Sequence, residues 1–406
     1  MQDNEKKPAL RFKGFTDPWE QRKLGDAFER VVRKNTNNES WLPLTISAQD
    51  GLVDQITYFN NRVASRDVSN YYLVYNGEFA YNKSTSDGYP FGAVKRLDWY
   101  EKGVLSTLYI VFALKHPEKD DSDFMTVFYD TDRWHRGVAE RAAEGARNHG
   151  LLNISAEDFF DIDTTMPEDK VEQEKIGRLL KKLDTLITLH QRKYEKLVNI
   201  KKSMLDKMFP PNGVSVPEIR FKGFTDPWEQ RKLDELGTIV TGSTPSTTND
   251  AYYADDGLLW VTPTDITKNI TCESARKLSA SGQKVARVVP RNTILVTCIA
   301  SIGKNTMLAN AGSFNQQING LTPDENKYVP YFLLTESVLW SAKMKVLAAT
   351  GTLQIINRTE FSEIKTFLPS FDEQKRISQY FEKLDTLITL HQREHIKPIL
   401  EVKRVK

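Results

Sequence analysis

Residues 182–192 read KLDTLITLHQR, and residues 383–393 repeat the same letters. A second repeat opens each half of the chain, because RFKGFTDPWEQRKL occupies residues 11–24 and again residues 220–233. The segments enclosed by these repeats, residues 24–165 and 233–366, share almost no sequence. Repetition on this scale predicts a duplicated architecture. The chain is therefore predicted to be a tandem of two units, with one constant frame and two different inserts.

Each KLDTLITLHQR copy lies in a predicted long helix, over residues 171–209 and 372–406. Apolar positions recur at alternating steps of four and three, which is the pattern of a coiled-coil seam. Pro398 is expected to shorten or bend the second helix, because proline does not fit a helix interior. The seam positions, predicted to carry helix and subunit packing, are Ile176, Leu180, Leu183, Ile187, His190, Ile377, Phe381, Leu384, Ile388 and His391.

The first helix would be roughly 58 Å long and has no partner within its own unit. The other copy is its natural partner. Residues 209–217 (FPPNGVSVP) end the first helix and lead directly into the second unit. The two helices are therefore predicted to run antiparallel, with one variable domain at each end and an approximate two-fold relation.

The inserts are predicted to mix helices and strands. Strand-length runs rich in β-branched and aromatic residues occur at 104–114, 124–129, 257–261 and 292–301, whereas residues 331–347 indicate a helix and residues 241–249 a loop. The predicted fold class is α+β, with two globular α/β domains separated by a pair of long antiparallel coiled-coil helices. The predicted divisions are domain one at 1–170, spacer helix at 171–209, linker at 210–219, domain two at 220–371 and a shorter spacer helix at 372–406.

Composition excludes several classes of protein. The chain has 406 residues with 56 Lys plus Arg against 54 Asp plus Glu, so its net charge is only +2. Any basic surface must therefore be local, as in residues 171–209, where basic residues outnumber acidic ones. No apolar run approaches the roughly 18 residues of a membrane span, and no secretory signal is visible. We expect a cytoplasmic protein without membrane contact.

The sequence shows no catalytic signature. It lacks GxGxxG, GxxxxGK[ST], HExxH and GxSxG, and also the Asn/Asp-Pro-Pro-aromatic motif of amino-group methyltransferases. His391 and His395 have the spacing of a metal pair, but seam packing is the favoured interpretation. Asp120, Asp121 and Asp123 could hold a cation, although a solvated turn is favoured. No metal site is predicted.

The duplicated KLDTLITLHQR helices follow EQEKI (172–176) and DEQKRI (372–377), and in these features the chain resembles the specificity subunit of a Type I restriction-modification system. In the second insert, GSTPS (242–246), the Trp260 strand, SIGK (301–304), NQQING (315–320) and TGTLQIIN (350–357) are similar to a target recognition domain of that family. The first insert fits by its position in the repeat.

The resemblance implies a non-catalytic DNA reader. Each target recognition domain would read one half of a bipartite, asymmetric site in double-stranded DNA, and the helices would set the gap. Two methylation subunits would dock on the scaffold, and restriction subunits would join through them. S-adenosylmethionine, ATP and magnesium would belong to those partners, whose complex would be an adenine-N6 DNA methyltransferase and ATP-dependent endonuclease. An approximate two-fold protein with unlike domains also suits a DNA dyad with unlike half-sites.

Candidate DNA contacts are polar and basic side chains in Gly-flanked or polar stretches, because such groups read base edges and phosphates. The candidates are Asn82, Lys83, Ser84, Thr85, Lys95, Arg96, Arg133, His135, Arg136, Lys304, Asn305, Gln316, Gln317, Thr350, Thr352 and Gln354. For each of them singly, a solvated loop or a structural hydrogen bond is the competing interpretation. Trp19 and Trp228 of the frame are interpreted as core or docking residues.

Two other functions stay open on the sequence. A coiled-coil adaptor without sequence-specific DNA binding would explain the helices but not two unlike, polar-loop-rich domains in identical frames. A stand-alone nuclease or methyltransferase would need activity in the isolated chain.

Overall fold

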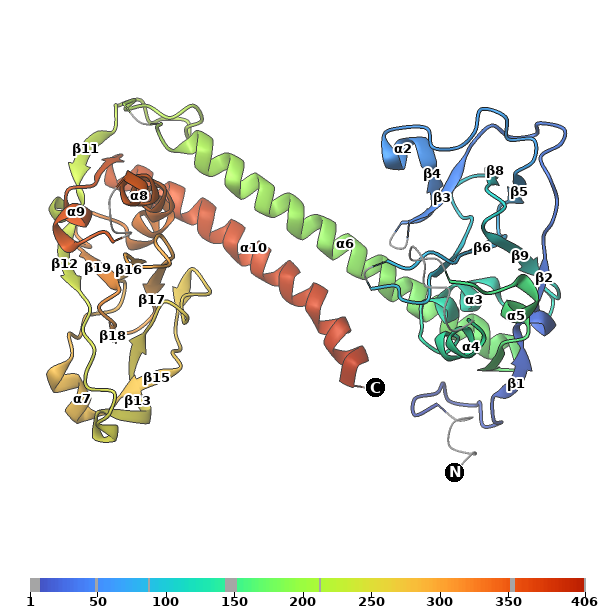
Figure 1. Cartoon of the computed structure of the whole chain (residues 1–406). Coiled ribbons are helices and arrows are strands. Elements are labelled where there is room, and N and C mark those ends of the chain that lie inside the picture. The colour runs from blue at the N-terminus through green and yellow to red at the C-terminus, as the bar shows by residue number, and fades with distance from the viewer. Residues whose placement is uncertain are drawn as a thin grey trace. The chain divides into compact units, whose positions relative to one another are not determined.

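The computed structural model describes residues 8–47, 50–86, 88–142, 152–211, 213–350 and 355–404, with the side chains of residues 350 and 393–404 outside that description. The chain divides into two compact units, residues 1–189 together with 398–406, and residues 190–397. Each unit therefore contains one α/β domain and parts of both long helices. These helices are α6 (Lys170–Met208) and α10 (Phe371–Arg404), which Figure 1 shows with the domains that adjoin them in sequence.

The first unit is built on an antiparallel sheet of four strands in the order β2-β9-β6-β7. One core joins this sheet to helices α3 and α5, with Phe79, Phe112 and Phe159 fully buried in it. Two further strand pairs, β3-β4 and β5-β8, enclose a second, smaller core. The elements are β1 (Glu20–Lys23), α1 (Leu24–Ala27), β2 (Phe28–Arg30), β3 (Leu44–Ser47), β4 (Gly51–Asp54), α2 (Gln55–Phe59), β5 (Tyr72–Tyr75), β6 (Phe79–Asn82), β7 (Ala93–Arg96), β8 (Lys102–Leu105), β9 (Ile110–Leu114), α3 (Ser122–Tyr129), α4 (His135–Arg141), α5 (Ala156–Phe160) and β10 (Asp163–Met166).

The second unit is built on a mixed sheet of five strands in the order β12-β19-β16-β17-β14, beside a three-stranded sheet β15-β13-β18. Helix α8 packs on β16 and β17 and supplies Phe332, Trp340 and Met344 to the main core. The elements are β11 (Glu229–Lys232), η2 (Leu233–Glu235), β12 (Gly237–Thr241), η3 (Asp250–Tyr252), β13 (Tyr253–Val261), β14 (Ile270–Thr271), β15 (Arg276–Leu278), α7 (Ala280–Val285), β16 (Ile294–Thr297), β17 (Asn305–Leu308), β18 (Gly312–Phe314), β19 (Ile318–Pro323), α8 (Pro330–Thr350), α9 (Arg358–Ser362) and β20 (Lys365–Leu368).

The α+β fold class is confirmed, but one predicted strand is wrong and another is divided in two. Residues 124–129 belong to helix α3, whose first turn is capped by the Asp121 carboxylate accepting from the Phe124 amide at 2.7 Å. A short apolar run fits a buried helix as well as a buried strand. Residues 104–114 form two strands, because a turn at 106–109 separates β8 from β9.

The seam predicted from the heptad pattern is the less exposed face of α6. Ile176, Leu180, Leu183 and Ile187 are half-buried, whereas Leu179, Leu186 and Leu189 on the other faces are 45%, 42% and 55% exposed. Such a difference is expected when one stripe of a helix packs and the rest meets solvent.

Within the second unit the two long helices run antiparallel. The Nδ1 atoms of His190 and His391 are 3.0 Å apart, and the Lys201 ammonium donates to Asp385 Oδ1 at 2.6 Å. Numbers therefore rise along α6 while they fall along α10. Ile377, Phe381 and Leu384 are buried there, and Ile388 is half-buried. The antiparallel pairing is thus present in this unit, and Lys201 at the seam is neutralised by an ion pair.

Helix α10 was expected to be shortened or bent at Pro398, and it continues through this proline to Arg404. An internal proline removes one backbone hydrogen bond and costs about 3 kcal/mol or more. A helix of 34 residues retains many other hydrogen bonds and contacts. At 34 residues, α10 is shorter than the 39 residues of α6.

Candidate nucleic-acid interface

The opening repeat and the start of each long helix are joined by a buried ion pair, here called the clasp. Arg11 donates from Nε and Nη2 to the two carboxylate oxygens of Glu172 at 2.6 and 2.7 Å. In the second unit Arg220 binds Glu373 in the same bidentate way, at 2.7 Å for both contacts. Each glutamate side chain is only 1% exposed. The constant sequences at the two ends of each insert therefore meet in space.

A glutamine next to each clasp glutamate holds the helix that follows the variable sheet. Gln173 accepts from the Asp121 amide at 2.8 Å and donates to the Pro167 carbonyl at 2.8 Å. Gln374 accepts from the Val329 amide and donates to the Pro369 carbonyl, both at 3.0 Å. Gln173 and Gln374 occupy equivalent positions in the two long helices. The Glu-Gln dipeptide in EQEKI and DEQKRI thus ties the frame to α3 and α8.

The two frame strands complete the constant scaffold. β1 pairs antiparallel with β10, and β11 pairs antiparallel with β20, so each insert begins and ends at one two-stranded ladder. Trp19 and Trp228 beside these ladders are 8% and 2% exposed. This burial agrees with a core role for both tryptophans. The two ends of each insert are thereby held together by a constant two-stranded ladder.

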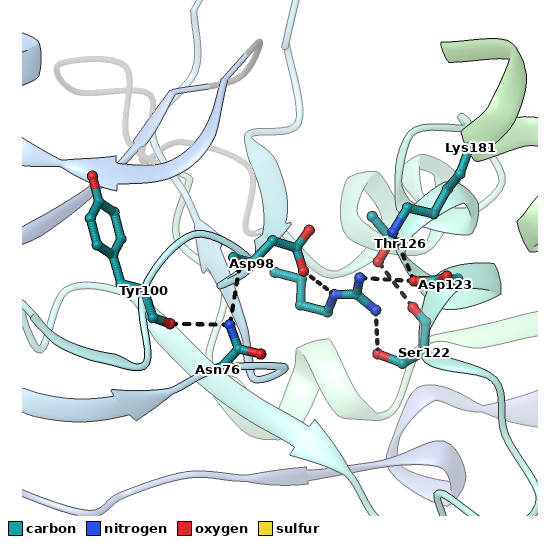
Figure 2. Close-up of polar contacts among 8 residues, drawn as sticks. Asn76, Asp98, Tyr100, Ser122, Asp123, Thr126 and Lys181 are labelled. Atoms are coloured by element: carbon teal, nitrogen blue, oxygen red, sulfur yellow. Dashed lines mark hydrogen bonds and ion pairs between the residues drawn. The ribbon is translucent and has the colours of Figure 1, made fainter. Parts of the chain in front are cut away.

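A polar network joins the first domain to α6, as Figure 2 shows. Arg96 of β7 donates to Asp98 at 2.6 Å, to the Ser122 hydroxyl at 2.7 Å and to Asp123 at 2.8 Å. Lys181 of α6 donates to the same Asp123 oxygen at 2.8 Å. Arg96 is only 11% exposed. We call this network, together with the α3 terminus and α6, the joint.

Lys95, the neighbour of Arg96 on β7, is also engaged near α6. Its ammonium lies 2.7 Å from Asp130, and its side chain is 15% exposed. The pKa of Asp184 on α6 is raised by burial and, to a smaller extent, by the charge of Asp130. The positive charge of Lys95 acts in the opposite direction and lowers that pKa. Lys95 and Arg96 therefore serve contacts within the first unit.

The aspartate cluster is neither a solvated turn nor a cation site. Asp120 binds Arg22 and Gln173, Asp121 caps α3, and Asp123 binds Arg96 and Lys181. The sequence could not show these partners, because most of them are distant along the chain. Within the described ranges, no group of three or more His, Cys, Asp or Glu side chains is placed to hold a metal ion.

The remaining candidates of the first domain gather around the β6–β7 hairpin. Asn82 accepts from the Ser84 amide at 3.0 Å, and Lys83 donates to the Ile154 carbonyl at 3.3 Å. Thr85 is half-buried in the same loop. The His135 ring lies 4.9 Å from that of Phe91, which ends this loop. The hairpin loop and the start of α4 therefore lie side by side.

Two arginines at this place reach solvent. Arg136 has an 87% exposed side chain and binds Glu140 one turn along α4 at 2.8 Å. The Arg133 guanidinium lies over the Trp19 ring at 5.4 Å. Burial lowers the pKa of His135, so its ring is neutral at pH 7 and suits a hydrogen bond better than a phosphate ion pair.

In the second domain, the main chain of Cys298 brings three candidate segments together. Its amide donates to the Gln317 carbonyl at 2.8 Å, and its carbonyl accepts from the Ile356 amide at 2.9 Å. Lys304 lies across the same loop, where its amide donates to the Thr297 hydroxyl at 2.9 Å. The SIGK, NQQING and TGTLQIIN motifs therefore converge at one end of the sheet.

The candidate side chains of this cluster differ in their exposure and in their hydrogen bonds. Lys304 and Gln316 are exposed, although Lys304 reaches the Pro263 carbonyl and Gln316 accepts from Thr244. Asn305 donates to Ser337 and Ser341 of α8, at 2.7 and 3.3 Å. Thr350 ends α8, with its side chain outside the description, and Thr352 and Gln354 lie outside the described residues.

The GSTPS loop adds a surface that the candidate residues did not include. A Cβ on Gly242 would lie 2.1 Å from the Asn315 carbonyl oxygen, so only glycine fits there. The Trp260 indole donates to the Ser243 carbonyl at 3.0 Å, and Arg287 is exposed beside the loop, donating to Thr241. Arg287 was not among the candidates, because nothing in the sequence placed it beside the GSTPS loop, 44 residues earlier in the chain.

The comparisons identify the class of the second domain. Residues 225–400 match the family described as Type I restriction modification DNA specificity domain. These residues contain the converging loops, the second clasp glutamate and most of α10. The resemblance to Type I specificity subunits that the repeat and its motifs predicted is confirmed.

The chain is also similar to proteins described as Type I restriction enzyme specificity subunits. The specificity subunit of the Type I restriction enzyme HindI from Haemophilus influenzae is 30% identical over 187 residues, which cover 44% of this chain and 41% of the relative. The MjaIX specificity subunit from Methanocaldococcus jannaschii is 27% identical, over 40% of this chain and 38% of the relative. These alignments thus span about two fifths of either relative.

A solved structure shares the fold over the whole chain. The S subunit of a Type I restriction-modification system from M. genitalium superposes with a TM-score of 0.62 at 13% identity, covering 98% of this chain and 97% of that one. At this identity the likeness concerns the fold alone. Among the described residues, no helix is both long enough and apolar enough to cross a membrane.

Proposed function

We propose that this chain is the DNA sequence-recognition subunit of a Type I restriction-modification complex, in which each variable domain reads one half of a bipartite, asymmetric site. The observation that carries the proposal is the repeated frame. Two identical clasps and ladders hold two unlike domains, and the second of these matches a DNA specificity domain. One constant scaffold with exchangeable readers is what recognition of two unrelated half-sites requires.

The candidate reading surfaces follow from exposure. In domain two, Lys304, Gln316 and Arg287 surround the converging loops and offer one amide and two cationic groups. In domain one, Arg133 and Arg136 are exposed next to the hairpin loop. Arginine, lysine and glutamine are the side chains that most often bind phosphates and guanine or adenine edges. We assign Lys95, Arg96 and Asn305 to internal contacts instead.

The long helices offer two matching sites for the methylation subunits. Leu189 and Leu390 occupy the same position in the KLDTLITLHQR repeat, and they are 55% and 47% exposed. Equal apolar residues at equivalent places suit two copies of one partner. Restriction subunits would join through these partners. S-adenosylmethionine, ATP and magnesium would be bound there, in a complex that methylates adenine N6 and cleaves DNA, within the cytoplasm.

The purified chain should transfer no methyl group to DNA, because the sequence contains no methyltransferase motif. Adding the two methylation subunits should give methylation at one bipartite sequence. The measurement is incorporation of labelled methyl groups from S-adenosylmethionine into DNA that contains the site or a scrambled copy. Methylation by the chain alone would refute a non-catalytic role, and equal methylation of both DNAs by the complex would refute sequence recognition.

A further inference from the structure

The joint of the first unit contains a close approach of two helices, α6 and α3. Gly177 of α6 faces the start of α3, where a Cβ would lie 2.6 Å from the Phe124 amide nitrogen and 3.0 Å from Asp121 Oδ1. The nearer atom belongs to the backbone, so a side-chain rotation cannot relieve the contact. Any larger residue at position 177 must move α3 and α6 apart.

One turn along α6, charged groups fix the same pair of helices. Lys181 binds Asp123, the second residue of α3, and Asp123 in turn binds Arg96 of the sheet. Figure 2 shows Lys181 and Asp123 meeting beside Ser122. Exposed ion pairs contribute little stability singly, but a network with a nearly buried arginine fixes a geometry. Sheet, α3 and α6 are therefore held at a set angle.

The second unit fills the same place with different residues. The Asp121 and Val329 amides donate to the equivalent Gln173 and Gln374, so residues two positions later, Asp123 and Tyr331, correspond to each other. Gly177 and Ser378, four residues after these glutamines, also correspond. Tyr331 donates from its hydroxyl to Asp385 Oδ2 at 2.8 Å, and Ser378 is buried. A domain-to-helix contact thus occurs in both units, while its chemistry and its spacing residue differ. The frame is constant, but the joint is specific to each domain.

We propose that Gly177, Asp123, Lys181 and Arg96 are positioning residues, which set the angle between the first recognition domain and α6 and thereby the base-pair gap at which its half-site is read. This inference rests on the proposed function. A displacement of about 1 Å at Gly177, with the Lys181 contact kept about 6 Å away, tilts α6 by roughly 10°. Residue 189, about 12 Å beyond Lys181, then moves by roughly 2 Å, which is more than half of the 3.4 Å step between base pairs.

The test replaces Gly177 by Ser, the residue that the second unit has at this position. In the full chain with Cys272→Ser, spin labels at Val63 and Leu189, both exposed and both in the first unit, report the angle. We expect their distance to change by about 2 Å. In the complete complex, assembled with the unlabelled Gly177→Ser chain, mapped methylation should move to a gap altered by one base pair, or fall at least tenfold at the original gap.

Control variants separate positioning from simple destabilisation. Val138→Ala opens the fully buried core of the first domain away from the joint and should change neither the label distance nor the gap. Lys181→Arg should keep the ion pair and behave as the parent, whereas Lys181→Met should shift the distance. A folded Gly177→Ser chain with the parental label distance would overturn the proposal. If the complex recognises no bipartite sequence, the proposed function fails. The label distance still shows whether Gly177 sets the angle between the first domain and α6.

Discussion

Replacing Glu373 by Ala is expected to lower the free energy of unfolding of the second unit by about 3–5 kcal/mol. The Glu373 carboxylate is 1% exposed and accepts both hydrogen bonds of Arg220, whose pKa it raises. Removing it leaves a guanidinium that is only 12% exposed and whose Nη1 already lacks a partner. An unpaired buried charge is the costly outcome, because the charge has lost both water and counterion.

The control for this prediction is an exposed ion pair in the same unit. Lys232 and Glu363 lie 2.6 Å apart, with side chains 40% and 55% exposed. Glu363→Ala should cost less than about 1 kcal/mol. Chemical unfolding, followed by tryptophan fluorescence, measures both variants. Equal losses for Glu363→Ala and Glu373→Ala would show that the clasp is not a principal support of the frame.

A second large effect should appear as a pH dependence of stability. Glu336 of α8 is fully buried, and burial raises its pKa to about 8 from an ordinary value of 4.5. One of its oxygens accepts from Thr366, and the other has no partner. The folded state therefore favours the protonated carboxyl. Its stabilising contribution is complete below about pH 4.5 and is lost as the pH rises through about 8.

Glu336→Gln should remove that dependence, because the amide keeps the volume and cannot ionise. At pH 9 the variant should exceed the parent chain by about 3–5 kcal/mol in free energy of unfolding, and the difference should shrink toward pH 5. Glu229→Gln, which changes a 71% exposed carboxylate, serves as the control and should leave the slope unchanged. A parent chain whose stability is flat between pH 5 and pH 9 would contradict the buried, neutral Glu336.

Much of the fold could be predicted from the repeat and the heptad pattern. Both depend on periodicity, which survives without knowledge of tertiary contacts. The half-burial of Leu183 and the exposure of Leu186 follow from that period alone. The pairing of His190 with His391 in the second unit follows from placing equal seam positions opposite each other. The error at residues 124–129 arose where an apolar run carried no period, and Asp121 was not recognised as a helix cap.

The functional residues were harder to predict, because their roles depend on distant partners. Arg96 and Asn305 have the composition of DNA-reading side chains, yet Asp123 and Ser337 bind them. Composition alone cannot distinguish an exposed arginine such as Arg136 from one that joins a sheet to a helix. The clasp glutamates were visible only as part of a family motif. Their partners, Arg11 and Arg220, lie more than 150 residues away in the RFKGFTDPWEQRKL repeat. The sequence alone did not show that this repeat pairs with the start of each long helix.

We infer that each insert reads its own half-site on a constant frame. The most direct test replaces residues 24–162, which lie between strands β1 and β10 of the first ladder, with the corresponding insert of another family member. The methylated adenines of DNA from cells with the complete system are then mapped. We expect one new half-site, with the other half-site unchanged. A change in both half-sites, or in neither, would contradict it.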